Sequence, residues 1–267
     1  MEFRTIVDIP EPGFRISPFE EMLFVGSCFA KEIGRRFQEE RFRATVNPYG
    51  VMYNPASILH TIQRLSTQSA KTAFLTLGTN HVYRLKETGD IVDNCQKRPQ
   101  SLFTEEALSV DACADYLRQA VVILRQMNPD IHIVLTVSPI RYRKYGYHGS
   151  QLSKATLLLA VEQLMSDTHI TTFPAYEILM DELRDYRFYQ EDMLHPSQQA
   201  IDYLWERLVD TYFSDEAKAF LSEWRPIKLA LNHKPFDPDS DEYHCFQEQT
   251  RLRLKELQEK YPELREI

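Results

Sequence analysis

The sequence has little of what a membrane protein or a nucleic-acid-binding protein needs. No apolar run in its 267 residues is long enough to span a bilayer, and acids and a proline stand near the start, where a secretory signal needs unbroken apolar residues. The formal net charge of -8 and the pI near 5.5 disfavour nucleic acid and anionic membranes as partners, because both surfaces are negatively charged. We therefore expect a cytoplasmic protein with neither kind of partner.

Cysteine is also scarce, and its positions exclude two kinds of site. The four cysteines are Cys28, Cys95, Cys113 and Cys245, with no C-x-x-C spacing. Isolated thiols fit a reducing compartment better than a disulfide framework or a structural zinc site. The sequence also contains no glycine-rich phosphate-binding loop. We therefore expect neither a metal nor a cofactor.

The chain alternates short apolar runs with helical patterns, which is typical of a parallel sheet covered on both faces. The predicted strands are residues 22–25, 44–46, 73–77, 131–137 and 170–173. The predicted amphipathic helices are residues 29–37, 54–65, 109–127, 153–165, 175–183 and 196–212. The pattern indicates an α/β protein with about five parallel strands.

The chain changes character after residue 214. Three prolines interrupt the helical pattern there, at Pro226, Pro235 and Pro238. A charged helix is predicted after them, at about residues 242–260. We expect residues 1–214 to form the main domain, and residues 215–267 to form an extension that packs on it or on a second subunit of a homodimer.

The first apolar strand leads into a serine that a helical pattern follows. Ser27 would thus stand at a helix N-terminus, where unpaired N–H groups and the helix dipole favour negative charge. Serine at this position is also a common N-cap, so a nucleophilic role requires a histidine base. Asp192 and His195, three residues apart, offer that base and the carboxylate that orients it. These residues predict a serine hydrolase with a Ser27-His195-Asp192 triad.

Cys28 is an alternative nucleophile, because a thiol is intrinsically more nucleophilic than a hydroxyl. The residue after a nucleophile in a strand-to-helix turn normally points into the fold, and free cysteine is among the most buried residue types. We therefore expect Ser27 to react and Cys28 to be buried. Arg141, at the end of the fourth predicted strand, is expected either to bind an anionic group of the substrate or to form a structural ion pair.

Gly26-Ser27-Cys28-Phe29-Ala30 spells the signature of the GSCFA domain family, a branch that resembles the SGNH/GDSL hydrolases. Further segments resemble the family in the same order, at residues 47–55, 75–79, 94–97, 137–141, 152–155 and 183–195. The resemblance implies a flavodoxin-like three-layer α/β/α fold of the SGNH-hydrolase kind. It also implies that the catalytic groups lie at the carboxyl ends of the strands.

The resemblance further implies an oxyanion hole built from the nucleophile's own N–H, a glycine N–H and an asparagine side chain. In this sequence they would be Ser27, Gly50 and Asn80, with Asn94 as the alternative asparagine. Gly50 is equally compatible with a simple turn. The sequence departs from the SGNH pattern at one point, since Gly26-Ser27 lacks the aspartate of Gly-Asp-Ser.

These features together predict a serine esterase that hydrolyses or transfers a short acyl group through an acyl-enzyme. The substrate class to try first, by analogy with the family alone, is a small-molecule or carbohydrate ester such as an O-acetyl group on a sugar. The alternatives are an acyltransferase and a binding module that kept the fold without turnover.

Overall fold

A computed structural model describes residues 4–66, 69–93, 95 and 98–265. Its central sheet has five parallel strands in the order β2-β1-β3-β7-β8. These strands are β1 (Glu21–Gly26), β2 (Arg43–Val46), β3 (Thr72–Leu77), β7 (His132–Val137) and β8 (Ile170–Thr172). Taken among themselves in chain order, they have the flavodoxin-like arrangement. The five predicted strands all form, within a few residues of their predicted bounds.

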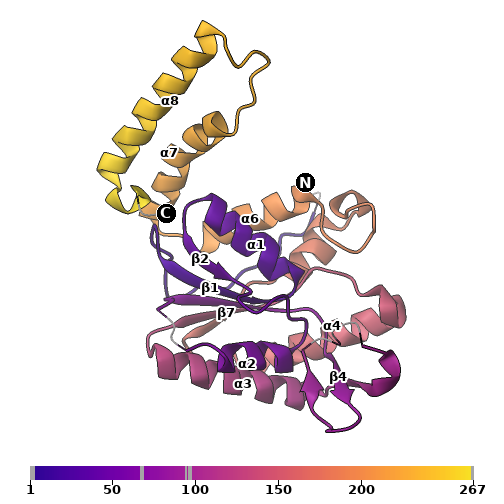
Figure 1. The fold of residues 1–267 in the computed structure, drawn as a ribbon. Helices are drawn as coiled ribbons and strands as arrows, with labels where there is room; N and C mark the ends of the chain where they lie inside the picture. The colour runs from indigo at the N-terminus through magenta and orange to yellow at the C-terminus, as the bar shows by residue number, and fades with distance from the viewer. Residues whose placement is uncertain (1–3, 67–68, 94, 96–97, 266–267) are drawn as a thin grey trace.

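Helices cover both faces of this sheet, as Figure 1 shows. On one face lie α1 (Cys28–Glu39) and α6 (Gln198–Tyr212). The other face carries α2 (Pro55–Gln63), α3 (Val110–Met127) and α4 (Gly146–Glu162). Because strand side chains alternate between the faces, neighbouring residues of β1 enter different hydrophobic clusters. The predicted three-layer α/β/α fold is confirmed.

The turn from β1 into α1 is tight against β3. Gly26 ends β1 with φ +140°, a conformation that L side chains rarely adopt. A Cβ atom at this position would lie 2.1 Å from the carbonyl oxygen of Thr76 on β3. Ser27 then caps α1, and its side chain accepts a hydrogen bond from the N–H of Phe29. The absence of a side chain at Gly26 thus lets the two strands and the start of α1 meet.

A small antiparallel sheet, β5-β4-β6, projects beside the main one and was not predicted. It consists of β4 (His81–Leu85), β5 (Ile91–Val92) and β6 (Phe103–Ala107). These strands are short, and most residues of β6 are exposed and polar, so no alternating apolar pattern marks them. The predicted helix at 175–183 forms with a different geometry, since α5 (Ala175–Glu177) continues as a π-helical turn, Ile178–Leu183.

The C-terminal extension is a helical hairpin of α7 (Asp215–Leu231) and α8 (Asp241–Lys260), at the top of Figure 1. The expectation that Pro226 interrupts the helix is wrong, because α7 continues through it. Trp224 and Ile227, on either side of the proline, are buried in a cluster with Phe220 and residues of α8, and this packing outweighs the lost hydrogen bond.

Polar contacts join the hairpin to the end of α1. The indole N–H of Trp224 donates to the carbonyl oxygen of Glu39, and Lys228 lies 2.8 Å from the Glu40 carboxylate. The boundary at residue 214 stays a prediction.

Among the described residues, no helix combines the length and the apolar character that crossing a bilayer requires.

Replacing Gly26 by alanine tests the strand-to-helix turn. We expect Gly26→Ala to lower the free energy of unfolding by about 3 kcal/mol or more, because the new Cβ would overlap the Thr76 carbonyl. The measurement is urea denaturation followed by tryptophan fluorescence. Gly13→Ala is the matched control, since nothing lies within 4 Å of a Cβ there. Equal stability of the two variants would contradict this account of the turn.

Candidate active site

A cavity of about 360 Å³ opens at the carboxyl ends of the central strands. Its walls come from the start of α1, the residues that follow β3 and β7, and the loop before α6. The lining residues are Ser27, Cys28, Tyr53, Gly78, Ser138, Ile140, Arg141, Tyr142, Arg143, Lys144, Leu194 and His195. Open parallel sheets usually bind ligands at this edge.

The loop before α6 holds Asp192 and His195 together. Asp192 Oδ2 lies 2.6 Å from His195 Nδ1, while Asp192 Oδ1 accepts hydrogen bonds from the N–H groups of Leu194 and His195, at 2.8 and 3.0 Å. These bonds, the one from the His195 N–H foremost, lower the pKa of Asp192 to about 2. The ionised carboxylate therefore orients the imidazole through Nδ1 and leaves Nε2 available as a base.

Ser27 borders the same cavity, but it is only 1 % exposed and bound to β3. Its Oγ lies 2.9 Å from Thr76 Oγ1 and also accepts the Phe29 N–H. Its own N–H donates to the carbonyl oxygen and to Oγ1 of Thr76. Within the described part of the chain, Ser27 and His195 form no hydrogen bond. The structure thus gives Ser27 a capping role and no free N–H for an oxyanion.

Cys28 is the first residue of α1, and the expectation that it is buried is wrong. The residue is partly exposed and borders the cavity, with its Sγ 3.7 Å from the hydroxyl of Tyr53. The reason is that Ser27, one residue earlier, turns toward β3 to cap the helix. Burial and the contact with Cys28 raise the pKa of Tyr53.

The other predicted oxyanion groups are engaged elsewhere. Gly50 has φ +98°, and its N–H closes a turn by donating to the carbonyl oxygen of Asn47 at 2.9 Å. Asn80 is 5 % exposed, and its Nδ2 donates to the carbonyl oxygen of Leu108 at 2.7 Å. Neither residue borders the cavity. Asn94 lies outside the described residues. The predicted set of Ser27 N–H, Gly50 and Asn80 is therefore not assembled.

Sequence reasoning missed two buried polar residues at this edge of the sheet. Ser138 follows β7 and is 0 % exposed, and its Oγ has no hydrogen-bond partner among the described residues. Lys154 on α4 is 1 % exposed, and its Nζ donates to the carbonyl oxygens of Gly78 at 2.7 Å and Ser138 at 2.8 Å. Burial lowers the pKa of Lys154 to about 7. Lys154 thus joins the ends of β3 and β7.

One signal for Lys154 was present in the sequence. It lies within the family-like segment at residues 152–155, on the face of α4 that also carries Ser150 and Leu157. A lysine on the buried side of an amphipathic helix needs a polar partner inside the protein. The sequence does not say which groups those partners are, because both lie on other elements.

Arg141 braces the loop that carries the histidine. Its N–H donates to the carbonyl oxygen of Leu194 at 3.0 Å, and its Nη1 donates to that of Met193 at 3.2 Å. Its guanidinium lies 4.2 Å from the ring centre of Tyr147. The structural ion pair is absent among the described residues, and none of those that line the cavity is acidic. An anionic substrate group at Arg141 therefore stays a prediction.

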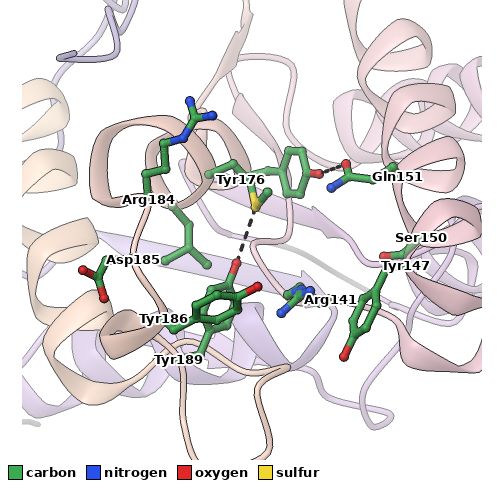
Figure 2. A pocket seen from close by; sticks show the side chains of 11 residues that line it. Arg141, Tyr147, Ser150, Gln151, Tyr176, Arg184, Asp185, Tyr186 and Tyr189 are labelled. Atoms are coloured by element: carbon green, nitrogen blue, oxygen red, sulfur yellow. Dashed lines mark hydrogen bonds between the residues drawn. The ribbon is translucent and has the colours of Figure 1, made fainter. Parts of the chain in front are cut away.

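A second cavity of about 230 Å³ shares Arg141 with the first (Figure 2). Four tyrosines line it, namely Tyr147, Tyr176, Tyr186 and Tyr189. The Tyr176 hydroxyl donates to Gln151, and the hydroxyl of Tyr189 lies 3.4 Å from Met180 Sδ. The π-helical turn Ile178–Leu183 forms part of its wall, and such turns are frequent at functional sites.

No described cluster of three His, Cys, Asp or Glu side chains is placed to hold a metal ion.

Comparison with known proteins adds a family and several solved structures. Residues 21–72 and 63–208 match the GSCFA family, and residues 224–265 match the GSCFA domain protein, C-terminal domain. No curated protein matches the chain. One similar structure is a member of the lipolytic protein G-D-S-L family from Veillonella parvula, with 12% identity, 72% of this chain and 98% of that chain covered, and a TM-score of 0.49.

Two esterase structures are also similar. A mutant of an acetyl-xylooligosaccharide esterase from Geobacillus has 14% identity, with 74% of this chain and 96% of that chain covered and a TM-score of 0.47. A family 3 carbohydrate esterase from Clostridium thermocellum has 13% identity, with 76% of this chain and 99% of that chain covered and a TM-score of 0.43.

The buried lysine predicts a particular dependence of stability on pH. Because the folded-state pKa of Lys154 lies near 7, far below that of an exposed lysine, the unfolded chain binds more protons than the native one above that pH. From about pH 7 to about pH 9.5, the free energy of unfolding of the wild type should therefore rise relative to Lys154→Met, by up to about 1.4 kcal/mol per pH unit.

Urea denaturation at several pH values measures this difference. Lys255→Met removes an exposed lysine of α8 and is the control, whose stability should follow that of the wild type at every pH. Parallel pH profiles for the wild type and Lys154→Met would show that Lys154 does not change its protonation in this range.

Proposed function

The chain belongs to the GSCFA family, and we propose that it hydrolyses esters of short acyl groups through a covalent acyl-enzyme. The observation that carries the proposal is the cavity that His195, Ser27 and Cys28 share at the carboxyl edge of the sheet. A base held by a carboxylate, in one cavity with a hydroxyl and a thiol at a helix N-terminus, is the minimum that nucleophilic acyl transfer needs.

In the proposed reaction, His195 takes the proton of a nucleophile that the Ser27-Cys28 turn supplies. The nucleophile bonds to the acyl carbon, and the N-terminus of α1 stabilises the oxyanion through its dipole and its unpaired N–H groups. His195 then donates the proton to the departing alcohol. Water attacks the acyl-enzyme with His195 as its base, which releases the acid. Asp192 keeps the imidazole oriented throughout.

The second cavity supports a carbohydrate as the alcohol half of the ester. Tyrosine offers an apolar ring face together with a polar hydroxyl, and a sugar offers apolar C–H faces together with hydroxyl groups. Tyr186 is 69% exposed, so its ring is available for stacking. Gln151 and Asp185 add hydrogen-bonding groups to the lining from different sides of the cavity (Figure 2). An O-acetylated sugar could extend from this cavity past Arg141 to the first one.

One observation favours a non-catalytic alternative on the same fold. If Ser27 were the nucleophile, its bonds to Thr76 and Phe29 would leave no contact with the base. A carbohydrate-binding module would tolerate that arrangement and would show saturable binding without turnover. An acyltransferase differs only in that an acceptor alcohol replaces water, so product analysis with added alcohols distinguishes it from a hydrolase.

Removal of the base tests the proposed reaction. We expect His195→Ala to lower kcat/KM for 4-nitrophenyl acetate by about 10²- to 10⁴-fold, because the nucleophile loses its proton acceptor. His148→Ala is the control, since His148 is exposed and lies outside both cavities. Wild-type turnover no faster than that of His195→Ala would contradict the proposal and favour the binding module.

The sugar subsite predicts that binding and chemistry respond separately to one substitution. Tyr186→Ala should raise KM for an O-acetylated xylooligosaccharide by about tenfold with little change in kcat, because a stacking surface is lost while the reacting groups stay in place. The same variant should leave 4-nitrophenyl acetate hydrolysis unaffected, since that ester needs no sugar subsite. Phe236→Ala, at a fully exposed ring that lines neither cavity, is the control. Equal effects on both esters would argue against the subsite.

A further inference from the structure

Ser27 and Cys28 differ in what their reactive atoms are already bound to. Ser27 Oγ contacts Thr76 Oγ1 at 2.9 Å and accepts the Phe29 N–H at 3.2 Å, in a position that is 1 % exposed. To attack a carbonyl, this hydroxyl would have to leave both partners and give up the cap of α1. The Ser27 hydroxyl therefore has a structural role, as the cap of α1 and the contact with β3.

Cys28 is placed differently. It is partly exposed at the first position of α1, and its side chain borders the cavity that His195 also borders. Within the described residues, the only polar contact of its sulfur is the hydroxyl of Tyr53, at 3.7 Å. A phenol is protonated at neutral pH, and burial raises the pKa of Tyr53 further, so this hydroxyl can donate a hydrogen bond to a sulfur that has lost its proton.

Two hydrogen-bond donors of residues that line the cavity have no partner among the described residues. The Cys28 N–H is at the first helical position, where no intrahelical acceptor exists, and no other acceptor is found among the described residues. The Ser138 hydroxyl is fully buried, borders the cavity and has no partner there either. By contrast, the Ser27 N–H is already donated to Thr76. An oxyanion formed by attack of Cys28 would find free donors, as acyl transfer requires.

We infer that Cys28 is the nucleophile, that the acyl-enzyme is a thioester, and that the Cys28 N–H and the Ser138 hydroxyl bind the oxyanion; this inference rests on the function proposed above. His195 accepts the thiol proton as the bond between Sγ and the acyl carbon forms. The tetrahedral intermediate then breaks its C–O bond, and His195 gives the proton to the departing alcohol. Water attacks the thioester with His195 as base, the C–S bond breaks and the thiol regains its proton. No oxidant or reductant is consumed.

The inference separates the roles of two neighbouring residues, and paired variants test it. With 4-nitrophenyl acetate, Cys28→Ala should lose at least about 100-fold in kcat/KM, since no nucleophile remains. Ser27→Ala should keep a tenth or more of the activity and should mainly lower the thermal stability, because it removes a cap. Should Ser27→Ala fail to fold, Ser27→Gly replaces it, since glycine is tolerated at an N-cap. Cys245→Ala removes an exposed cysteine of α8 and is the matched control.

Two further readouts identify the reacting atom. Acid quench during turnover followed by peptide mass spectrometry should find the acetyl group on Cys28. Iodoacetamide should alkylate Cys28, and the rate of this alkylation should fall by about tenfold or more in His195→Ala, because the base no longer takes the thiol proton. The rate at Cys245 should not change.

The outcomes distinguish failure of the inference from failure of the proposed function. Turnover with the acetyl group on Ser27, or full activity of Cys28→Ala, overturns the inference and leaves the esterase proposal standing. No turnover, together with alkylation of Cys28 that depends on His195, overturns the ester substrate and supports the activated thiol. If there is no turnover, and Cys28 is alkylated at the same rate in the wild type and in His195→Ala, both the inference and the proposed function are overturned.

Discussion

The hydrogen bonds between Ser27 and Thr76 determine where α1 begins, and the arrangement of the cavity depends on that point. They form only because Gly26 has no side chain, which allows the end of β1 to lie against the carbonyl of Thr76. Once Ser27 turns toward β3 to cap the helix, the next residue must face another way. Cys28 is then the first helical residue; it borders the cavity, and its N–H has no intrahelical acceptor.

The opposite wall is held by two basic side chains that bind backbone carbonyl oxygens and form no ion pair among the described residues. Lys154 is buried in α4 and joins the ends of β3 and β7 through two backbone carbonyls, so the strand ends that border the cavity cannot separate freely. Arg141 holds the loop of His195 in place by donating hydrogen bonds to the carbonyl oxygens of Met193 and Leu194. Neutral carbonyl partners leave the positive charge of Arg141 uncompensated near the site.

Much of the fold could be predicted because it depends on patterns that are local in the sequence. The strands β1, β3 and β7 are short apolar runs buried on both faces, and such runs are visible without knowledge of their neighbours. The contact between Asp192 and His195 is also local, since the two residues lie three positions apart in one loop. The strand β6 was missed because most of its residues are exposed, so its sequence shows no apolar pattern.

The site was predicted less well, because its polar groups choose partners that are distant in the sequence. Asn80 has a suitable side chain just after a buried strand, yet Leu108 takes its amide. Gly50 closes a turn with Asn47, as its residue type equally allowed. The proposal of Cys28 over Ser27 rests on a contact between Ser27 and Thr76, which is almost fifty residues away in the chain. Sequence patterns suggest which residues have useful chemistry, whereas tertiary hydrogen bonds decide which of them are free to use it.

The charge around the cavity is compatible with the proposed acyl transfer. The whole chain carries a formal charge of -8, but the cavity is bordered by Arg141, Arg143 and Lys144 and by no acidic residue among those described. Lys144 is paired with Glu105 at 2.9 Å, while Arg143 has no ion pair in the described part of the chain. The positive side chains do not stabilise a neutral ester that enters the cavity. They do stabilise the oxyanion that forms during the proposed attack. An interaction that strengthens only as charge develops lowers the barrier without tightening substrate binding.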